Sequence, residues 1–135
     1  MRIFLLFSHR YLYIYIYLIF MTLQTQLEHI TSESEFNAAI NKNENVMICC
    51  GRMGPMCIPV YHEMELLRED YSNVKFMDML FDLPDSRLIR DLPECRGFMG
   101  LPFTVYFRNG KVAAATTSVQ TKDQITTILD REFGS

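Results

Sequence analysis

From residue 27 onward, short apolar runs alternate with stretches in which apolar residues recur every three or four positions. Short apolar runs between turn-forming residues are typical of buried strands, and the longer periodic stretches indicate amphipathic helices. The expected strands cover residues 26–30, 45–50, 73–82, 103–107 and 111–117, and the expected helices cover residues 31–43, 56–70, 85–92 and 121–133. This order predicts an α/β fold, with a central mixed sheet of four to five strands flanked by about four helices.

Local signals support two of these elements. Thr31 or Ser32 is placed to cap the first expected helix, and Glu35 stands where the acidic residue of a capping box belongs. Asn109-Gly110 separates the last two expected strands, and this dipeptide tolerates the positive φ angles of a tight hairpin turn. The chain therefore predicts its own element boundaries at these points.

Residues 1–20 differ from the rest, because they consist almost entirely of Tyr, Ile, Leu and Phe. Our leading interpretation is a mis-assigned start, with translation from Met21 and a cytoplasmic domain over residues 21–135. The first alternative is a membrane anchor that keeps Arg2 and Arg10 in the cytoplasm and the domain outside it. The second is a signal peptide, although no small-residue cleavage site follows the apolar run.

Composition limits the function classes. The chain has 135 residues, 49% of them hydrophobic, which suits one domain with a packed core. Its formal net charge is −3. A general nucleic-acid binder needs a basic surface, so we expect no nucleic-acid partner. We expect a monomer.

Three of the four cysteines, Cys49, Cys50 and Cys57, fall within nine residues, and Cys95 is the fourth. Such clustering indicates a local redox or metal site rather than a secreted disulfide scaffold. Zinc is the weaker alternative, because neighbouring strand residues point to opposite faces and no second pair completes four ligands. We therefore expect no metal or organic cofactor.

Cys57 is the best candidate nucleophile, because it opens an expected helix, whose N-terminus favours a thiolate. Cys50 is its natural partner, at a C-x6-C spacing made pliable by Gly51 and Gly54. The alternatives are that Cys57 is buried and inert and that Cys50 only fills space. Cys49 is expected to pack in the core.

The order of elements, with "GPMC" opening the second helix and "GLPF" before the hairpin, resembles the thioredoxin family over residues 27–133. The resemblance implies that Pro102 is the cis-proline facing the active-site sulfur and that Cys57 is the second, resolving cysteine. It also places Gly54 and Pro55 at, or beside, the Gly-Pro before the helix. These residues, with Phe103 after the cis-proline, are the expected substrate-binding positions.

The departures from the thioredoxin pattern are as informative as the matches. Gly54 takes the position of the first, nucleophilic cysteine, so the C-x-x-C pair is absent. Five other family residues are replaced, namely the tryptophans by Cys50 and Met53, the buried aspartate by Ile48, its neighbouring lysine by Asp78, and the threonine after the cis-proline by Phe103.

Two further residues carry hypotheses. Asp78 lies within an apolar strand, where burial would raise its pKa, and it is a candidate base in place of the aspartate lost at Ile48. The alternative is an acid at the sheet edge, solvated or paired with Lys75 or an arginine. Cys95 precedes the loop to Pro102 and is a possible extra thiol, with a surface or packing role as the alternative.

The sequence thus predicts a thiol–disulfide oxidoreductase of thioredoxin type with a displaced cysteine pair. Cys57 or Cys50 would attack a protein disulfide, and the other cysteine would resolve the mixed disulfide. Electrons would come from a thiol reductase or another dithiol protein. The alternative is a redox-inactive, protein-binding module that retains the thioredoxin fold.

Overall fold

The structure is a computed structural model that describes residues 12–13 and 22–134. Its centre is one five-stranded sheet with the strand order β1-β3-β2-β4-β5. The strands β1, β3 and β2 run parallel, whereas β4 pairs antiparallel with both β2 and β5. The sheet is therefore mixed, as predicted, and its strands are β1 (Glu28–Ile30), β2 (Asn45–Gly51), β3 (Lys75–Leu80), β4 (Phe103–Arg108) and β5 (Lys111–Thr117).

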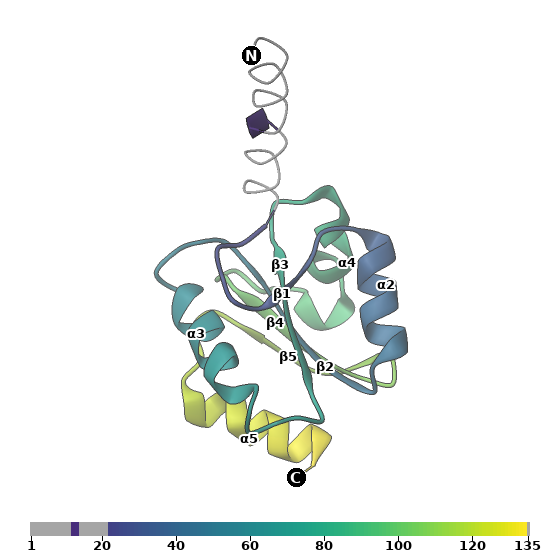
Figure 1. Cartoon of the computed structure of the whole chain (residues 1–135), viewed down its shortest axis with the longest axis vertical. Helices are drawn as coiled ribbons and strands as arrows, with labels where there is room; N and C mark the ends of the chain where they lie inside the picture. Colours follow the sequence, from purple (N-terminus) through teal and green to yellow (C-terminus); the bar gives the residue numbers. More distant parts are fainter. Residues whose placement is uncertain (1–11, 14–21, 135) are drawn as a thin grey trace, which may run out of the picture.

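Four helices cover the sheet within the described part of the chain, together with two short 3₁₀ turns. Helices α3 and α5 gather on one side of the strands, and α2 and α4 lie on the other (Figure 1). The helices are α2 (Glu33–Lys42), α3 (Ile58–Leu67), α4 (Arg87–Arg90) and α5 (Lys122–Phe133), and the 3₁₀ turns are η1 (Pro84–Ser86) and η2 (Pro93–Cys95). The predicted α/β architecture is confirmed.

Side-chain caps define the start of two helices. The Ser32 hydroxyl accepts a hydrogen bond from the Glu35 amide at 3.1 Å, and the Glu35 carboxylate accepts one from the Thr31 amide at 3.0 Å. At α5, Thr121 and Gln124 exchange equivalent bonds at 3.2 and 2.8 Å. These side chains satisfy backbone donors that the first helical turn leaves unpaired.

The hairpin between β4 and β5 turns at Asn109 and Gly110, which have φ angles of 51° and 77°. Both angles lie in the left-handed region, where asparagine and glycine are the favoured residues. The Asn109 amide also donates to the Glu44 carbonyl at 2.8 Å, which ties the turn to the start of β2. The predicted Asn-Gly hairpin is confirmed.

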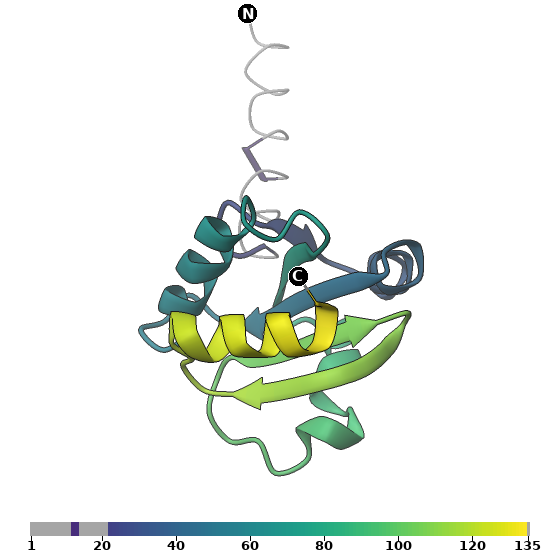
Figure 2. The ribbon, with the colours of Figure 1, turned by 90° about the horizontal axis from the view of Figure 1, so that it is seen from below.

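The sheet separates two hydrophobic cores, and β2 contributes alternate residues to each. Met47 and Cys49 belong to the α3/α5 core, where they pack with side chains of α3 and α5, which lie side by side in Figure 2. Val46, Ile48 and Cys50 belong to the α2/α4 core on the opposite face. The expectation that Cys49 and Cys50 point to opposite faces is confirmed, because side chains alternate along a strand.

The apolar extension over residues 1–20 lies outside the described residues, apart from Leu12 and Tyr13, which are both exposed. Within the part of the chain that the structure describes, none of the helices combines the length and the apolar character needed to cross a bilayer.

Two adjacent leucines on α3 provide a test of the α3/α5 core. Leu67 is 2% exposed, whereas Leu66 is 59% exposed. We expect Leu67→Ala to lower the free energy of unfolding by about 2–5 kcal/mol, because it leaves a cavity in the core. The matched Leu66→Ala should change it by less than about 0.5 kcal/mol. Urea denaturation of both variants measures the difference, and equal losses would contradict this placement of α3.

Candidate thiol site

Cys57 lies where the loop from β2 enters α3. It occupies the N-cap position of the helix, and its side chain is 3% exposed. The amides of Cys57 and Ile58 both donate to the Gly54 carbonyl, at 3.1 and 3.0 Å, so a tight turn precedes the helix. Pro59 lies in the first helical turn, where its missing N–H costs little.

The Cys57 sulfur lies beside Gly51, and Pro102 borders the same glycine. A Cβ built on Gly51 would lie 2.8 Å from Cys57 Sγ, 3.0 Å from Pro102 Cβ and 2.6 Å from the Tyr61 hydroxyl. The missing side chain of Gly51 therefore makes the space in which the thiol, the phenol and the proline meet. The Leu101–Pro102 peptide bond is cis. We call these four residues, Gly51, Cys57, Tyr61 and Pro102, the thiol site.

The loop above the thiol site is open toward solvent. A Cβ on Gly54 would meet no heavy atom within 4 Å. Met53 and Met56, on either side of Gly54 and Pro55, are 44% and 46% exposed. Gly54 is thus an unobstructed glycine in a loop with two exposed methionines.

Cys50, the expected partner of Cys57, lies in the other core. It is fully buried, and burial raises the pKa of its thiol to about 12, although a hydrogen bond from Ser86 and the charge of Arg90 act against the rise. Cys57 packs in the α3/α5 core, whereas Cys50 packs in the α2/α4 core. The structure does not bring the two residues of the C-x6-C spacing together.

The four cysteines fall into two sets, one on each face of the sheet. Cys49 shares the α3/α5 core with Cys57, and Cys95 shares the α2/α4 core with Cys50. All four are buried free thiols. The Thr104 hydroxyl contacts Cys49 Sγ at 3.7 Å, and burial raises the pKa of Cys49. Burial also raises the pKa of Cys95, to about 11.

Phe103 is buried in an aromatic cluster beside this end of the sheet. Its ring meets the rings of Phe81 and Phe98 edge to face, each at a centroid distance of 5.3 Å. Arg52 lies over Phe81 at 5.5 Å and forms a bidentate ion pair with Asp82, with both N–O distances 2.8 Å. Phe103 therefore packs in the α2/α4 core, on the face of the sheet opposite Cys57.

Sequence reasoning missed Phe81 and Asp82, because neither belongs to a motif. Arg52 follows β2, and Phe81 and Asp82 follow β3. Their cation–π contact and ion pair can be recognised only when the two strands are placed side by side.

Asp78 lies on β3, inside the sheet and fully buried. One oxygen of the Asp78 carboxyl group accepts a hydrogen bond from the Thr25 hydroxyl at 2.5 Å. The other oxygen lies 2.6 Å from His29 Nδ1. Burial raises the pKa of Asp78, as expected, and the two hydrogen bonds act in the opposite direction. The alternative of a solvated or Lys75-paired acid at the edge is wrong, because Lys75 binds Glu28 at 2.7 Å.

His29 and Thr25 are the partners that sequence reasoning did not identify for Asp78. The His29 side chain is 28% exposed, so it connects the buried carboxylate to the surface. Glu65 of α3 is the next acidic group near Asp78 and raises its pKa slightly further. The role of Asp78 as a base for thiol exchange stays a prediction.

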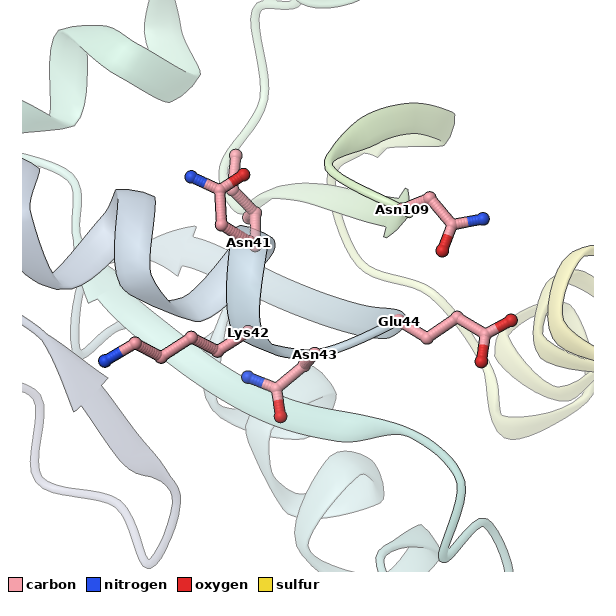
Figure 3. Close-up of a pocket in the computed structure, with 6 residues that line it drawn as sticks. Asn41, Lys42, Asn43, Glu44 and Asn109 are labelled. Carbon is pink, nitrogen blue, oxygen red and sulfur yellow. The ribbon is translucent and has the colours of Figure 1, made fainter.

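The part of the chain that the structure describes also has features away from the thiol site. No group of three or more His, Cys, Asp or Glu residues there is arranged to bind a metal ion. A polar pocket involves Asn41, Lys42, Asn43, Glu44 and Asn109, at the end of β2 far from Cys57. Its labelled side chains point in different directions instead of converging on one point (Figure 3).

Solved thioredoxin structures share this fold. Thioredoxin f2 from Chlamydomonas reinhardtii matches with a TM-score of 0.67 at 15% identity, covering 81% of this chain and 98% of that one. Oxidised thioredoxin from Plasmodium falciparum matches with a TM-score of 0.63 at 16% identity, covering 82% and 100%. A mutant thioredoxin from Halobacterium salinarum matches with a TM-score of 0.65 at 15% identity, covering 78% and 88%.

No protein-family model and no curated protein matches the chain. The solved thioredoxin structures described above, at 15–16% identity, establish a thioredoxin-like fold. The chain has cysteines and no C-x-x-C pair. The activity has to be argued from the site itself.

The crowding at Gly51 is testable by substitution. Gly51→Ala places a methyl group within 3.0 Å of Cys57 Sγ, Pro102 Cβ and the Tyr61 hydroxyl, so the thiol site must shift. We expect a loss of about 1–3 kcal/mol in the free energy of unfolding. The matched Gly54→Ala meets open space and should be neutral or stabilising by up to about 1 kcal/mol. Urea denaturation of both variants decides, and equal stabilities would contradict the packing.

The raised pKa of Asp78 predicts a pH dependence with a definite sign. The carboxyl group of Asp78 binds its proton more tightly in the folded state than in the unfolded state, where the pKa of aspartate is about 3.9. The contribution of Asp78 to stability is therefore present below that pH and is lost as pH rises through its folded pKa. We expect the free energy of unfolding of the wild type, measured relative to that of Asp78→Asn, to decrease as the pH rises through this range.

Asp82 provides the matched control, because its ion pair with Arg52 lowers its pKa. The difference between wild type and Asp82→Asn should fall as pH drops, which is the opposite direction. Urea denaturation of the three proteins between pH 3 and pH 8 measures both slopes. Parallel slopes for the two variants would show that the environment of Asp78 differs from this description.

Proposed function

We propose that this protein exchanges thiols and disulfides with polypeptide partners and that Cys57 is its reacting thiol. The observation that carries the proposal is the position of Cys57 Sγ, which lies at the entry to α3 beside Gly51, a glycine that Pro102 also borders. A thiol at a helix N-terminus is favoured as a thiolate by the helix dipole. Cys49, Cys50 and Cys95 lie within the cores and have raised pKa values.

The reaction needs no group beyond thiols. The Cys57 thiolate attacks one sulfur of a partner disulfide, a new sulfur–sulfur bond forms, and the other partner sulfur leaves as a thiolate with the electron pair. A second thiolate then attacks the mixed disulfide and releases Cys57. If Cys50 supplies that thiolate, the loop from Gly51 to Cys57 must open, since the two residues lie in different cores. A dithiol protein or a thiol reductase supplies it without such a movement.

The surface around the thiol site suits an extended polypeptide. Met53, Met56 and Ile58 expose nearly half of their area, and Met99, in the loop before Pro102, is 94% exposed. Methionine side chains are flexible and polarisable, so they adapt to different apolar partners. Gly54 and Pro55 add backbone without bulk, and Pro102 borders the thiol itself.

A second candidate is a binding module that uses this same surface without thiol chemistry. The observation in its favour is that all four thiols are buried while the methionines around them are exposed. In this case Cys57 fills the space beside Gly51, and the apolar surface holds the partner.

The two candidates differ in whether they need the Cys57 sulfur. We expect Cys57→Ser to lower the rate of exchange with a fluorescent disulfide-bonded peptide by at least about 100-fold. The reason is that the neutral serine hydroxyl does not attack a disulfide as a thiolate does. Cys49→Ser, a control in the same core, should keep the wild-type rate within about three-fold. Reduced-peptide binding, followed by fluorescence anisotropy, should be the same in all three proteins.

Two results would contradict the exchange proposal. Wild-type protein that binds the peptide without exchanging it would establish the binding module. A Cys57→Ser variant that exchanges at the wild-type rate would place the reacting thiol elsewhere.

A further inference from the structure

We propose that Cys50 and Cys95 are a second redox pair, on the face of the sheet opposite Cys57, and that oxidation joins them in an internal disulfide. This pair goes beyond the proposed exchange at Cys57 and does not require it. It also replaces the Cys50–Cys57 pairing that the C-x6-C spacing suggests.

The first argument is the side of the sheet on which each thiol lies. Cys50 points into the α2/α4 core from β2, and Cys95 ends η2 in that same core. Cys57 packs in the α3/α5 core. Because neighbouring residues of β2 point to opposite faces, a bond from Cys50 to Cys57 requires the end of the strand to unwind, whereas Cys95 needs no such change.

A short series of contacts connects Cys50 to Cys95. Phe103 is the residue of β4 that pairs with Cys50 in the sheet. The Phe103 ring packs edge to face with Phe98 at 5.3 Å, and the Phe98 amide donates to the Cys95 carbonyl at 3.1 Å. Through Phe98, the segment that carries Cys95 is held against Phe103 of β4, and η2 itself packs on β5, the strand next to β4.

The surroundings of Cys50 are unusual for a thiol that only fills space. Ser86 is fully buried beside it, and its hydroxyl donates to the Leu80 carbonyl at 2.5 Å. The Arg90 guanidinium is fixed by the carbonyls of Phe81 and Leu83, at 2.6 and 2.9 Å. Both Ser86 and Arg90 favour the thiolate form of Cys50 against its burial. A permanent positive charge near a buried sulfur assists any step in which that sulfur carries negative charge.

The electrostatic coupling between the thiols agrees with this pairing. A negative charge on Cys95 raises the pKa of Cys50 more than a negative charge on Cys57 does. Burial raises the pKa of both thiols. Cys95 is expected to react first because it lies in a short 3₁₀ turn outside the sheet, whereas Cys50 is held within β2.

Cys95 also lies in the more adjustable segment. It ends a 3₁₀ turn of three residues outside the sheet, and Gly97 follows with a φ of 82°. Cys50, by contrast, is held in a strand with hydrogen-bonded neighbours on both sides. Closing the disulfide thus requires η2 to move toward a fixed β2, and the loop from Gly97 to Pro102 would move with η2.

The chemistry balances with one small-molecule disulfide as the oxidant. The Cys95 thiolate attacks that disulfide, forms a mixed disulfide and releases one small thiolate. The Cys50 thiolate then attacks the Cys95 sulfur, which forms the internal bond and releases the second small thiolate. Two protein thiols are oxidised, and one small disulfide is reduced to two thiols.

Trypsin separates the relevant cysteines, which makes the pairing measurable. Cleavage after lysine and arginine gives peptides 43–52 with Cys49 and Cys50, 53–68 with Cys57, and 91–96 with Cys95. The experiment uses the full chain carrying Cys49→Ser, so that peptide 43–52 holds one cysteine. The protein is equilibrated with oxidised glutathione, free thiols are alkylated, and the digest is analysed by mass spectrometry.

We expect peptide 43–52 to be linked to peptide 91–96 and dithiothreitol to reverse the link. Adding Cys95→Ser to the same protein should abolish this link, and a far-ultraviolet circular dichroism spectrum like that of the parent confirms that the variant is folded. A link from 43–52 to 53–68, or protein that keeps Cys50 and Cys95 as free thiols, would overturn the proposal.

The same variants separate this proposal from the exchange activity. Cys95→Ser alone should exchange disulfide-bonded peptide at the wild-type rate if Cys57 is the reacting thiol. Normal exchange without the link between 43–52 and 91–96 would overturn the second pair and leave the proposed function intact. The link between 43–52 and 91–96 without exchange would support the second pair and overturn the proposed function.

Discussion

The complete burial of β2 is the constraint that decides where the cysteines of this protein lie. All seven residues of the strand are buried, and it is hydrogen-bonded to β3 on one side and β4 on the other. Successive side chains of such a strand point alternately to the two faces of the sheet. The alternation therefore decides which cysteines share a core and which are separated by the backbone.

This constraint changes the meaning of the displaced cysteine spacing. Cys50 and Cys57 are seven positions apart in the sequence, yet they face different cores, whereas Cys95 is 45 positions beyond Cys50 and shares its core. The thiol site combines the entry to α3 with the cis peptide bond before Pro102. Under the proposed function, a partner disulfide approaches Cys57, which lies beneath the loop that carries Gly54.

The surroundings of Asp78 are likewise set by the pairing of strands in the sheet. The sequence resemblance to thioredoxins places their buried aspartate at Ile48 of β2, and this chain has a buried carboxyl group on the adjacent strand, at Asp78. Parallel pairing sets Asp78 beside Cys49 on β2 and beside His29 on β1. A buried carboxylate needs hydrogen-bond donors, and His29 and Thr25 supply them. Asp78 is thereby tied to the start of the domain, and its proton is coupled to a histidine that reaches the surface.

The sequence by itself determined the features that depend on local patterns. Apolar periodicity, the cap at Ser32 and the Asn-Gly turn identified the order of strands and helices, and the period of two along β2 placed Cys49 and Cys50 on opposite faces. Only the tertiary structure decided which distant groups meet. The pairing of Asp78 with His29, of Arg52 with Asp82, and of the Cys50 core with Cys95 depends on the strand order β1-β3-β2-β4-β5. That order is set by packing between segments far apart in the chain, and no local periodicity records it.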